Sequence, residues 1–308
     1  MEKVNIILQG DVINRLKDIE DNTIQCVVTS PPYWGLRDYG EDNQLGLEET
    51  PEEYVENMVN VFREVKRTLK DDGTLWLNIG DSYNTTQAGN KTWGNGVGSN
   101  KQYAKGIIPK KRNKTLGLKP KDLVGIPWRV AFALQQDGWY LRQDIIWHKP
   151  NPMPESVTDR CTKSHEYIFL MSKSVNYYYD AESIKEKTLT NDNINRDRDT
   201  TRLNNTPGRT RMAGLKTNNY EKRNKRSVWK INTQPYKEAH FAVFPEKLPE
   251  LCIKAGSKEG DIVLDPFFGS GTTGFVAQRL YRKWIGIELN PEYIKIANKR
   301  FVQQELFV

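Results

Sequence analysis

The stretch IVLDPFFGSGTT, residues 262–273, decides the fold of this 308-residue chain. A predicted strand, residues 261–264, leads to the carboxylate of Asp265, and a glycine-rich turn then opens a predicted helix. Glycine lets the backbone approach a ligand closely, and the first turn of a helix offers N–H groups that have no partner within the helix. The pattern therefore predicts a ligand site at the carboxyl end of a strand, although turn glycines alone would also fit a purely structural turn.

A second acidic residue indicates which kind of ligand this site holds. Glu288 ends the next predicted strand, nineteen residues after Gly269, where a carboxylate can accept hydrogen bonds from the two hydroxyls of a ribose. A dinucleotide site normally has a third glycine for its pyrophosphate, whereas here Asp-Pro-Phe-Phe precedes the turn. An acid beside aromatic faces favours a cationic ligand. We therefore expect S-adenosyl-L-methionine, which carries a sulfonium, rather than NAD.

Strands and helices alternate through most of the remaining chain. The predicted strands are residues 4–8, 24–29, 74–79, 140–147, 165–171 and 284–288, and the predicted helices are residues 51–69, 123–136, 271–280 and 291–301. The apolar, β-branched strand 24–29 is typical of a sheet that is covered on both faces. The fold class is therefore predicted to be α/β.

The sequence Thr29-Ser-Pro-Pro-Tyr-Trp34 directly follows this strand. Its two prolines fix φ and remove two backbone donors, so that the carbonyls project from a stiff turn. An exocyclic amine of a nucleobase is a poor nucleophile because its lone pair is delocalised into the ring. The Ser30 hydroxyl and the Pro31 carbonyl would accept its protons, and Tyr33 would stack on the extruded base. An isolated loop of this kind fits a rigid surface turn better than an active site, so the interpretation depends on the cofactor pattern.

The positive charge of the chain gathers in two stretches. The net charge is +7 and the pI is about 9.1. Residues 187–230 hold twelve Lys or Arg against four acids, and residues 84–121 hold nine and no acid. Such stretches are often solvated, flexible segments, and in a base-modifying enzyme they would instead neutralise phosphates. We predict DNA contacts from them.

Other classes of protein fit poorly. The chain has no run of eighteen apolar residues, so we expect no membrane span and no secretion signal. Cys26, Cys161 and Cys252 lie far apart without ligand-type neighbours, and we expect buried thiols and no metal site. His148 and His165 are expected to have packing roles.

Together these motifs resemble the amino-methyltransferases of DNA, in the beta-class arrangement. TSPPYW comes first, the basic region follows, and residues 240–245, DPFFGSGT and GIEL come last. The resemblance implies a Rossmann-like sheet with helices on both faces and an antiparallel terminal hairpin. It also implies a catalytic part in residues 1–180, with an insert at about 82–121, a target-recognition region in residues 181–235, and a cofactor-binding part in residues 236–308.

The resemblance assigns roles to individual residues. The catalytic residues are Ser30, Pro31, Pro32 and Tyr33. The residues that hold S-adenosyl-L-methionine are Asp11, Thr29, Phe244, Pro245, Asp265, Pro266, Phe267, Gly269, Ser270, Gly271, Thr272 and Glu288. The DNA contacts are predicted from the two basic stretches and not from the resemblance, and they are Lys110, Lys111, Arg112, Arg209, Arg211, Arg223 and Arg226.

Serine at position 30 resembles the enzymes that methylate N4 of cytosine, whereas Asp or Asn is more usual for N6 of adenine. We therefore expect methylation of cytosine N4 in double-stranded DNA by base flipping, with adenine N6 as the alternative. Two further hypotheses remain: a methyltransferase of RNA or of protein glutamine, and an inactive DNA-binding relative. We also expect the enzyme to be cytoplasmic and nucleoid-associated, with a cognate restriction endonuclease as partner.

Overall fold

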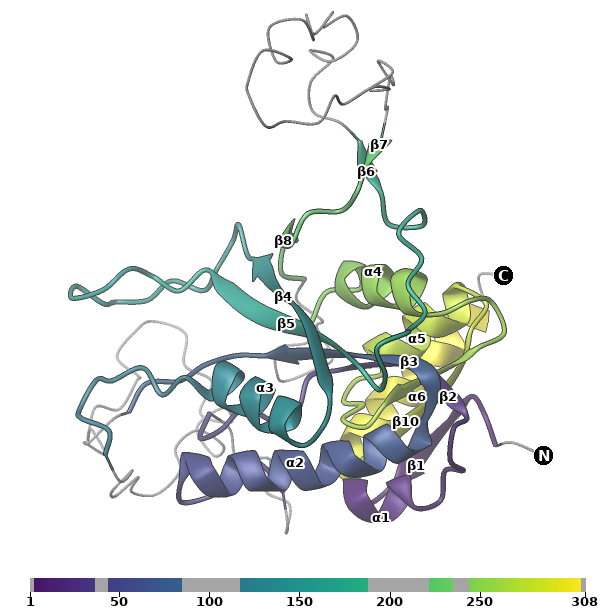
Figure 1. The fold of residues 1–308 in the computed structure, drawn as a ribbon, viewed down its shortest axis with the longest axis horizontal. Coiled ribbons are helices and arrows are strands. Elements are labelled where there is room, and N and C mark those ends of the chain that lie inside the picture. The colour runs from purple at the N-terminus through teal and green to yellow at the C-terminus, as the bar shows by residue number, and fades with distance from the viewer. Residues whose placement is uncertain (1–2, 37–43, 85–116, 188–221, 235–243, 306–308) are drawn as a thin grey trace, which may run out of the picture. The chain divides into compact units, whose positions relative to one another are not determined.

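The computed structural model describes residues 3–36, 44–84, 117–187, 222–234 and 244–305. An eight-stranded sheet runs through it in the order β1-β10-β9-β2-β3-β5-β4-β8 (Figure 1). Its strands are β1 (Ile6–Gln9), β2 (Ile24–Thr29), β3 (Leu69–Ile79), β4 (Tyr140–His148), β5 (His165–Ser172), β8 (Val228–Lys230), β9 (Ile262–Asp265) and β10 (Lys283–Glu288). The predicted α/β fold class is confirmed.

Strand directions divide the sheet into two parts. Neighbours from β1 through β10, β9 and β2 to β3 all pair in parallel. Beyond them β5 is antiparallel to both β3 and β4, which forms the expected antiparallel hairpin, and β8 pairs with β4 in parallel. The two ends of the chain meet in the parallel part, because N-terminal β2 lies beside C-terminal β9.

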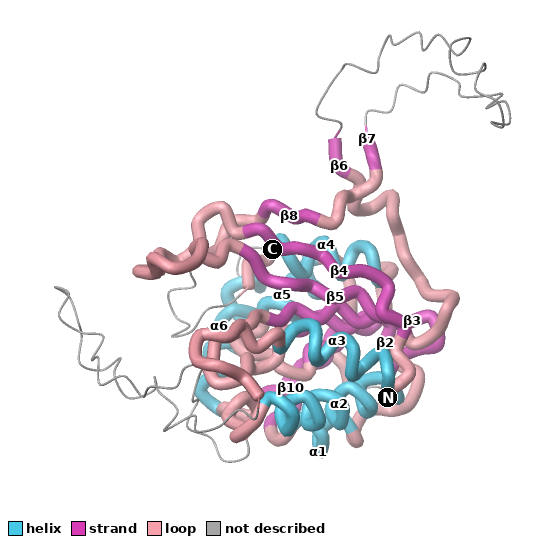
Figure 2. Tube along the Cα trace, turned by 60° about the vertical axis from the view of Figure 1, so that its left-hand side comes forward, coloured by secondary structure: helices cyan, strands magenta, loops and turns pink. Residues whose placement is uncertain are grey.

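Two groups of helices enclose the sheet, whose strands form one layer between them (Figures 1 and 2). The first group is α1 (Val12–Leu16), α2 (Pro51–Thr68) and α3 (Ile126–Gln136), and the second is α4 (Lys247–Gly256), α5 (Thr272–Arg279) and α6 (Pro291–Glu305). Alternation along β2 shows the two faces, since Val27 joins the core that contains α2, whereas Cys26 faces Gly256 of α4. Every residue of β2 is buried, as its apolar sequence predicted.

Local sequence explains where the longest helix begins. Thr50 is the N-cap of α2 and accepts a hydrogen bond from the backbone N–H of Glu53. The Glu53 carboxylate accepts in return from the N–H of Thr50, which completes a capping box, and Pro51 occupies the first helical turn. Apolar side chains at Tyr54, Met58 and Phe62 then turn one stripe of the helix into the core.

The chain divides into two compact units. The larger comprises Met1–Asp180 and Ser227–Val308 and contains the eight-stranded sheet, and the smaller is Ala181–Arg226. Within the smaller unit β6 (Glu186–Lys187) and β7 (Lys222–Arg223) form a two-stranded antiparallel sheet. This unit begins where the target-recognition region was predicted to begin; its role in recognition stays a prediction.

Each element predicted from sequence is present, with shifts of a few residues at some ends. The sequence did not indicate α1, α4 or the short strands β6, β7 and β8, and β3 begins at Leu69, five residues before the predicted strand. Among the described residues no helix combines the length and the apolar character that a membrane span requires.

Candidate active site

Several of the predicted catalytic and cofactor residues lie at one edge of the sheet. Parallel strands all end at the same edge, and here β1, β10, β9 and β2 end at Gln9, Glu288, Asp265 and Thr29. Because β5 is antiparallel to β3, its first residues lie at this edge too, with Tyr167 opposite Ile79. Segments from both ends and from the middle of the chain therefore contribute to a single site.

The centre of this edge is a topological switch point. From β9 the chain passes through α5 to β10, on one side, whereas from β2 it passes through α2 to β3, on the other. The loops after β9 and β2 therefore diverge, and α/β sheets bind ligands in the crevice that such a divergence leaves. Asp265 and Thr29 are the last residues of these two strands.

The Asp265 carboxylate joins the two loops. Its Oδ1 accepts hydrogen bonds from the Thr29 hydroxyl at 2.7 Å and from the N–H of Phe267 at 3.0 Å, and its Oδ2 accepts from the Thr273 hydroxyl at 2.6 Å. The side chain is buried, and burial raises its pKa from 3.8 to about 6, although these hydrogen bonds oppose the rise. The predicted cofactor residue thus also fixes the start of the catalytic loop.

Glu288 shapes the glycine-rich turn. Its Oε2 accepts a hydrogen bond of 2.7 Å from the N–H of Gly269, and its Oε1 accepts one of 2.8 Å from the N–H of Asn290. Gly269 has a φ of +53°, and a side chain placed there would meet no atom of the described residues within 4 Å. Open space therefore lies over this glycine, beside a carboxylate whose pKa is raised by burial.

Asp11 follows β1, the strand that pairs with β10, and lies just beyond the carboxyl end of that strand. The preceding Gly10 donates its N–H to the Glu288 carbonyl at 3.0 Å, and the Asp11 side chain caps α1 by accepting from the N–H of Asn14. Asp11 thus lies just after β1 and Glu288 ends the neighbouring strand β10, so both residues are at the same edge of the sheet.

The two phenylalanines of DPFF have different roles. Phe268 is buried and stacks on Trp284, and a side chain at Gly274 or Gly286 would come within 2.6 Å or 2.3 Å of its ring. Phe267 is only partly buried and packs at the margin of the core. Phe268 is therefore structural, whereas a cofactor contact for Phe267 stays a prediction.

A buried arginine connects the remaining cofactor motifs. Arg300 of α6 donates to the Thr272 hydroxyl at 3.0 Å and pairs with Glu246 at 2.7 Å. Thr272 begins α5, and Glu246 directly follows Pro245. The Phe244-Pro245 motif is thus tied to the first turn of α5, whereas residues 240–243 lie outside the described residues.

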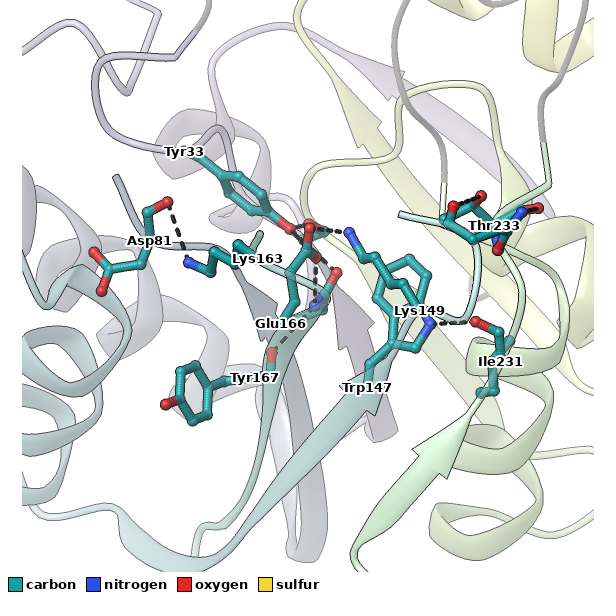
Figure 3. Close-up of polar contacts among 12 residues, drawn as sticks. Tyr33, Asp81, Trp147, Lys149, Lys163, Glu166, Tyr167, Ile231 and Thr233 are labelled. Carbon is teal, nitrogen blue, oxygen red and sulfur yellow. Dashed lines mark hydrogen bonds and ion pairs between the residues drawn. The ribbon is translucent and has the colours of Figure 1, made fainter. Parts of the chain in front are cut away.

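The catalytic loop is held on both sides. The Pro32 carbonyl accepts a hydrogen bond of 2.8 Å from the hydroxyl of Tyr54 on α2, and Pro31 is buried. The Tyr33 hydroxyl lies 3.2 Å from Ser30 Oγ and donates to Glu166 at 2.8 Å (Figure 3). Burial, followed by the charge of Glu166, raises the pKa of Tyr33 well above its ordinary value, so its phenol is neutral.

Sequence reasoning missed four residues of this site. Gly80 follows β3, and a side chain there would come within 2.6 Å of the Tyr33 ring. Asn78 and Glu166 lie beside the Tyr33 hydroxyl, and Lys149 pairs with Glu166. The only available signal was that Lys149 follows one predicted strand and Glu166 lies near the start of the next.

Comparison with known proteins places this geometry in a family. The sequence profile described as DNA methylase matches residues 24–299, which is most of the chain. The chain belongs to the DNA methylase family. This methylase is 51% identical over 298 residues to type II methyltransferase M.SmaI of Serratia marcescens, covering 97% of this chain and 91% of that protein. It is 48% identical over 294 residues to M.Cfr9I of Citrobacter freundii, covering 96% of this chain and 86% of that protein.

Solved structures share the fold of this DNA methylase. The PvuII DNA methyltransferase, described as cytosine-N4-specific, superposes with a TM-score of 0.64 at 22% identity, over 96% of this chain and 85% of the other. A putative DNA modification methylase from Thermus thermophilus, complexed with S-adenosyl-L-methionine, gives a TM-score of 0.60 at 23% identity, over 97% and 93%. The predicted Rossmann-like sheet is confirmed.

S-adenosyl-L-methionine is the cofactor of this DNA methylase, and the described residues fit it. The space over Gly269 admits a ligand against the backbone, with the Glu288 carboxylate beside it to accept from hydroxyl or amino groups. The Ser270 hydroxyl is buried and finds no hydrogen-bond partner among the residues that the structure describes. A polar ligand would supply that partner.

The predicted DNA contacts are only partly described. Arg223 and Arg226 both pair with Glu186, at 2.9 Å and 2.8 Å, and Lys225 joins them at 3.2 Å. One carboxylate thus holds three cations within the smaller unit. The other predicted contacts, Lys110, Lys111, Arg112, Arg209 and Arg211, lie outside the described residues.

Proposed function

We propose that this DNA methylase transfers a methyl group to the exocyclic N4 amine of cytosine in double-stranded DNA, with the target base turned out of the helix. The observation that carries the proposal is the position of Ser30 directly after Thr29, whose hydroxyl the cofactor-loop carboxylate Asp265 holds at 2.7 Å. The residue that faces the amine is thereby fixed relative to the loop that faces the methyl donor.

The chemistry requires positioning more than covalent participation. When bound, S-adenosyl-L-methionine supplies an electrophilic methyl group on its sulfonium. Ser30 Oγ and the Pro31 carbonyl accept hydrogen bonds from the two N–H groups of the amine, which directs the nitrogen lone pair toward that methyl group. The Pro32 carbonyl is occupied by Tyr54 and serves to fix the loop.

Tyr33 would provide the surface on which the extruded base stacks. Its ring is set against Gly80 and its hydroxyl is anchored by Glu166, so its orientation is fixed before DNA binds. A stack on a preset ring offsets part of the cost of removing the base from the duplex.

Two observations support cytosine. Position 30 is a serine, and a protein that shares this fold, the PvuII enzyme, is described as cytosine-N4-specific. Adenine N6 is the second candidate, because its amine requires the same pair of acceptors. Both substrates fit a basic enzyme that binds DNA in the cytoplasm at the nucleoid, with a cognate restriction endonuclease as partner.

The test is to incubate the protein with labelled S-adenosyl-L-methionine and plasmid DNA and to identify the methylated nucleosides by mass spectrometry. We expect N4-methylcytosine. N6-methyladenine as the sole product would overturn the choice of base, and label found only in RNA or protein would overturn the proposed function. Ser30→Ala should bind the cofactor normally yet lose most of its turnover.

A further inference from the structure

Acceptors surround the hydroxyl of Tyr33. It lies 2.8 Å from Glu166 Oε2 and 3.3 Å from Asn78 Oδ1 (Figure 3). The Asn78 amide turns its Nδ2 toward Glu166 Oε2 at 3.2 Å and toward the Tyr167 carbonyl at 3.1 Å, so its oxygen faces Tyr33. An ionised carboxylate only accepts hydrogen bonds. The single hydroxyl proton of Tyr33 is therefore directed away from Ser30.

This arrangement fixes the direction of the next hydrogen bond. Ser30 Oγ lies 3.2 Å from the Tyr33 hydroxyl. Since the Tyr33 proton points to Glu166 or Asn78, the Tyr33 oxygen offers only lone pairs on this side, and the Ser30 hydroxyl donates to it. The lone pairs of Ser30 Oγ are then left to accept.

The direction matters for methylation of an amine. A serine hydroxyl donates as readily as it accepts. If its proton pointed at the amine, it would bond to the nitrogen lone pair, which is the pair of electrons that must attack the methyl group. A serine held as an acceptor instead receives a hydrogen bond from an N–H of the amine and leaves that lone pair free.

Lys149 holds the end of this chain of hydrogen bonds. Its ammonium pairs with Glu166 Oε1, and the two side chains are 19% and 16% exposed. The same ammonium lies 4.2 Å from the centre of the Trp147 ring, whose Nε1 donates to the Ile231 carbonyl at 2.9 Å. An ammonium group can only donate hydrogen bonds. Glu166 therefore accepts from Lys149 at Oε1, and its Oε2 faces the donors Tyr33 and Asn78.

We propose that Glu166 is a positioning residue for methyl transfer, which, through Tyr33, turns the Ser30 hydroxyl into an acceptor for the target amine. The proposal rests on the proposed function, because it takes from it the contact between Ser30 and the amine. It adds a second task for Tyr33, whose hydroxyl relays the orientation while its ring remains available for stacking.

Glu166→Gln tests the direction of the chain with little change in shape. Lys149 can only donate, so the glutamine oxygen will turn to it and the amide NH₂ will face Tyr33, which reverses the hydrogen bonds. Tyr33→Phe removes the relay but keeps the ring. We expect each variant to lower the single-turnover rate by about 100-fold with saturating DNA and cofactor, the cost of losing a preset geometry. Their KM values should change little.

The double variant Tyr33→Phe/Glu166→Gln distinguishes a relay from two separate effects. Residues that act as one unit have non-additive effects, so the double variant should be no slower than the slower single variant. A double variant whose rate loss equals the product of the two single losses would overturn the proposal. A wild-type rate for Tyr33→Phe would overturn it too, because this variant removes only one hydroxyl group and is the least disturbing to the fold. Base flipping, followed by the fluorescence of 2-aminopurine at the target position, should be unchanged.

Glu155→Gln is the matched control. Glu155 pairs with Arg160 at 2.6 Å in the segment that connects β4 to β5, as Glu166 pairs with Lys149, but this ion pair does not include the catalytic loop. The variant should keep the wild-type rate. The two hypotheses fail separately: a wild-type protein that methylates no exocyclic amine refutes the proposed function, whereas an active wild type with fully active Glu166→Gln and Tyr33→Phe refutes the orientation alone.

Discussion

The Asp265 carboxylate accepts a hydrogen bond of 2.7 Å from the Thr29 hydroxyl, 236 positions earlier in the chain. The same carboxylate accepts from Thr273 at 2.6 Å, in the first turn of α5. One buried side chain therefore fixes the catalytic loop, the glycine-rich loop and the helix that follows it. A change at this position should affect folding and both halves of the site together.

Asp265→Asn should reveal this group in the pH dependence of stability. Burial raises the pKa of Asp265 from 3.8 to about 6, so the folded protein holds the proton more tightly than the unfolded chain. Protonated Asp265 therefore stabilises the folded protein relative to the ionised residue. This stabilisation is fully present below the unfolded pKa and is lost as the pH rises through about 6. We expect the free energy of unfolding of wild type, minus that of the variant, to fall by up to about 3 kcal/mol across this range. Urea titrations at several pH values measure it, and a difference that rises with pH would contradict the assignment.

Glu288→Gln should weaken cofactor binding without unfolding the protein. Its carboxylate orders Gly269 and would accept from the cofactor, and losing hydrogen bonds to a charged group costs about 1.5–3 kcal/mol, or about 10- to 100-fold in Kd. Burial raises the pKa of Glu288, so this carboxylate is protonated at a higher pH than an ordinary Glu. As the pH is lowered, the affinity of the wild type for the cofactor should therefore begin to fall before the ordinary titration range of Glu is reached. Calorimetry with S-adenosyl-L-methionine checks both points. Equal affinity of variant and wild type at neutral pH would exclude the role.

Gly80→Ala should displace the Tyr33 ring. The new methyl group would lie 2.6 Å from Tyr33 Cε2, a distance that real contacts do not show, and the ring is held from its other end by Glu166. We expect a loss of about 100-fold in kcat from this misplacement, with unchanged cofactor affinity. A variant with normal turnover would show that the position of the ring is not critical.

Arg300→Met should destabilise the protein, and Arg279→Met serves as its control. Arg300 has a side chain that is only 9% exposed and joins Glu246 to Thr272, whereas Arg279 is 44% exposed and pairs with the same Glu246. Removing the buried partner should cost about 3 kcal/mol, and removing the exposed one less than about 1 kcal/mol. Denaturant unfolding measures both. Similar costs for the two variants would refute this role of Arg300.

Arg226→Ala should weaken DNA binding in a salt-dependent manner. Arg226 is 59% exposed even while it pairs with Glu186, so its guanidinium is accessible to a phosphate. Losing one phosphate contact should reduce the slope of log K against log salt by about 1. Lys295→Ala, which removes an exposed cation from α6, should leave the slope unchanged. An unaltered slope for Arg226→Ala would remove this residue from the DNA interface.

The sequence by itself determined the elements and the two motif loops. The run of β-branched residues in β2 and the strand, turn and helix of residues 262–273 are local patterns, and local conformational preferences are sufficient to read them. The order of the motifs then indicated a DNA amino-methyltransferase with S-adenosyl-L-methionine. The sequence did not predict α1 because it has only 5 residues, and it did not predict α4 because the N-cap residue Glu246 makes no capping hydrogen bond with its side chain.

The tertiary structure decided which residues complete the site. Glu166 and Asn78 reach Tyr33 only because β5 pairs with β3 in one antiparallel register, which places Tyr167 opposite Ile79. Likewise, Asp265 contacts Thr29 only because β9, near the C-terminus, pairs with β2, near the N-terminus. Strand register is set by which face of each strand is buried and by pairing between strands that are far apart in the sequence, and not by residues adjacent in the sequence. A local pattern can therefore predict a loop, but the partners that orient the hydroxyl groups of the loop are brought to it only by the assembled sheet.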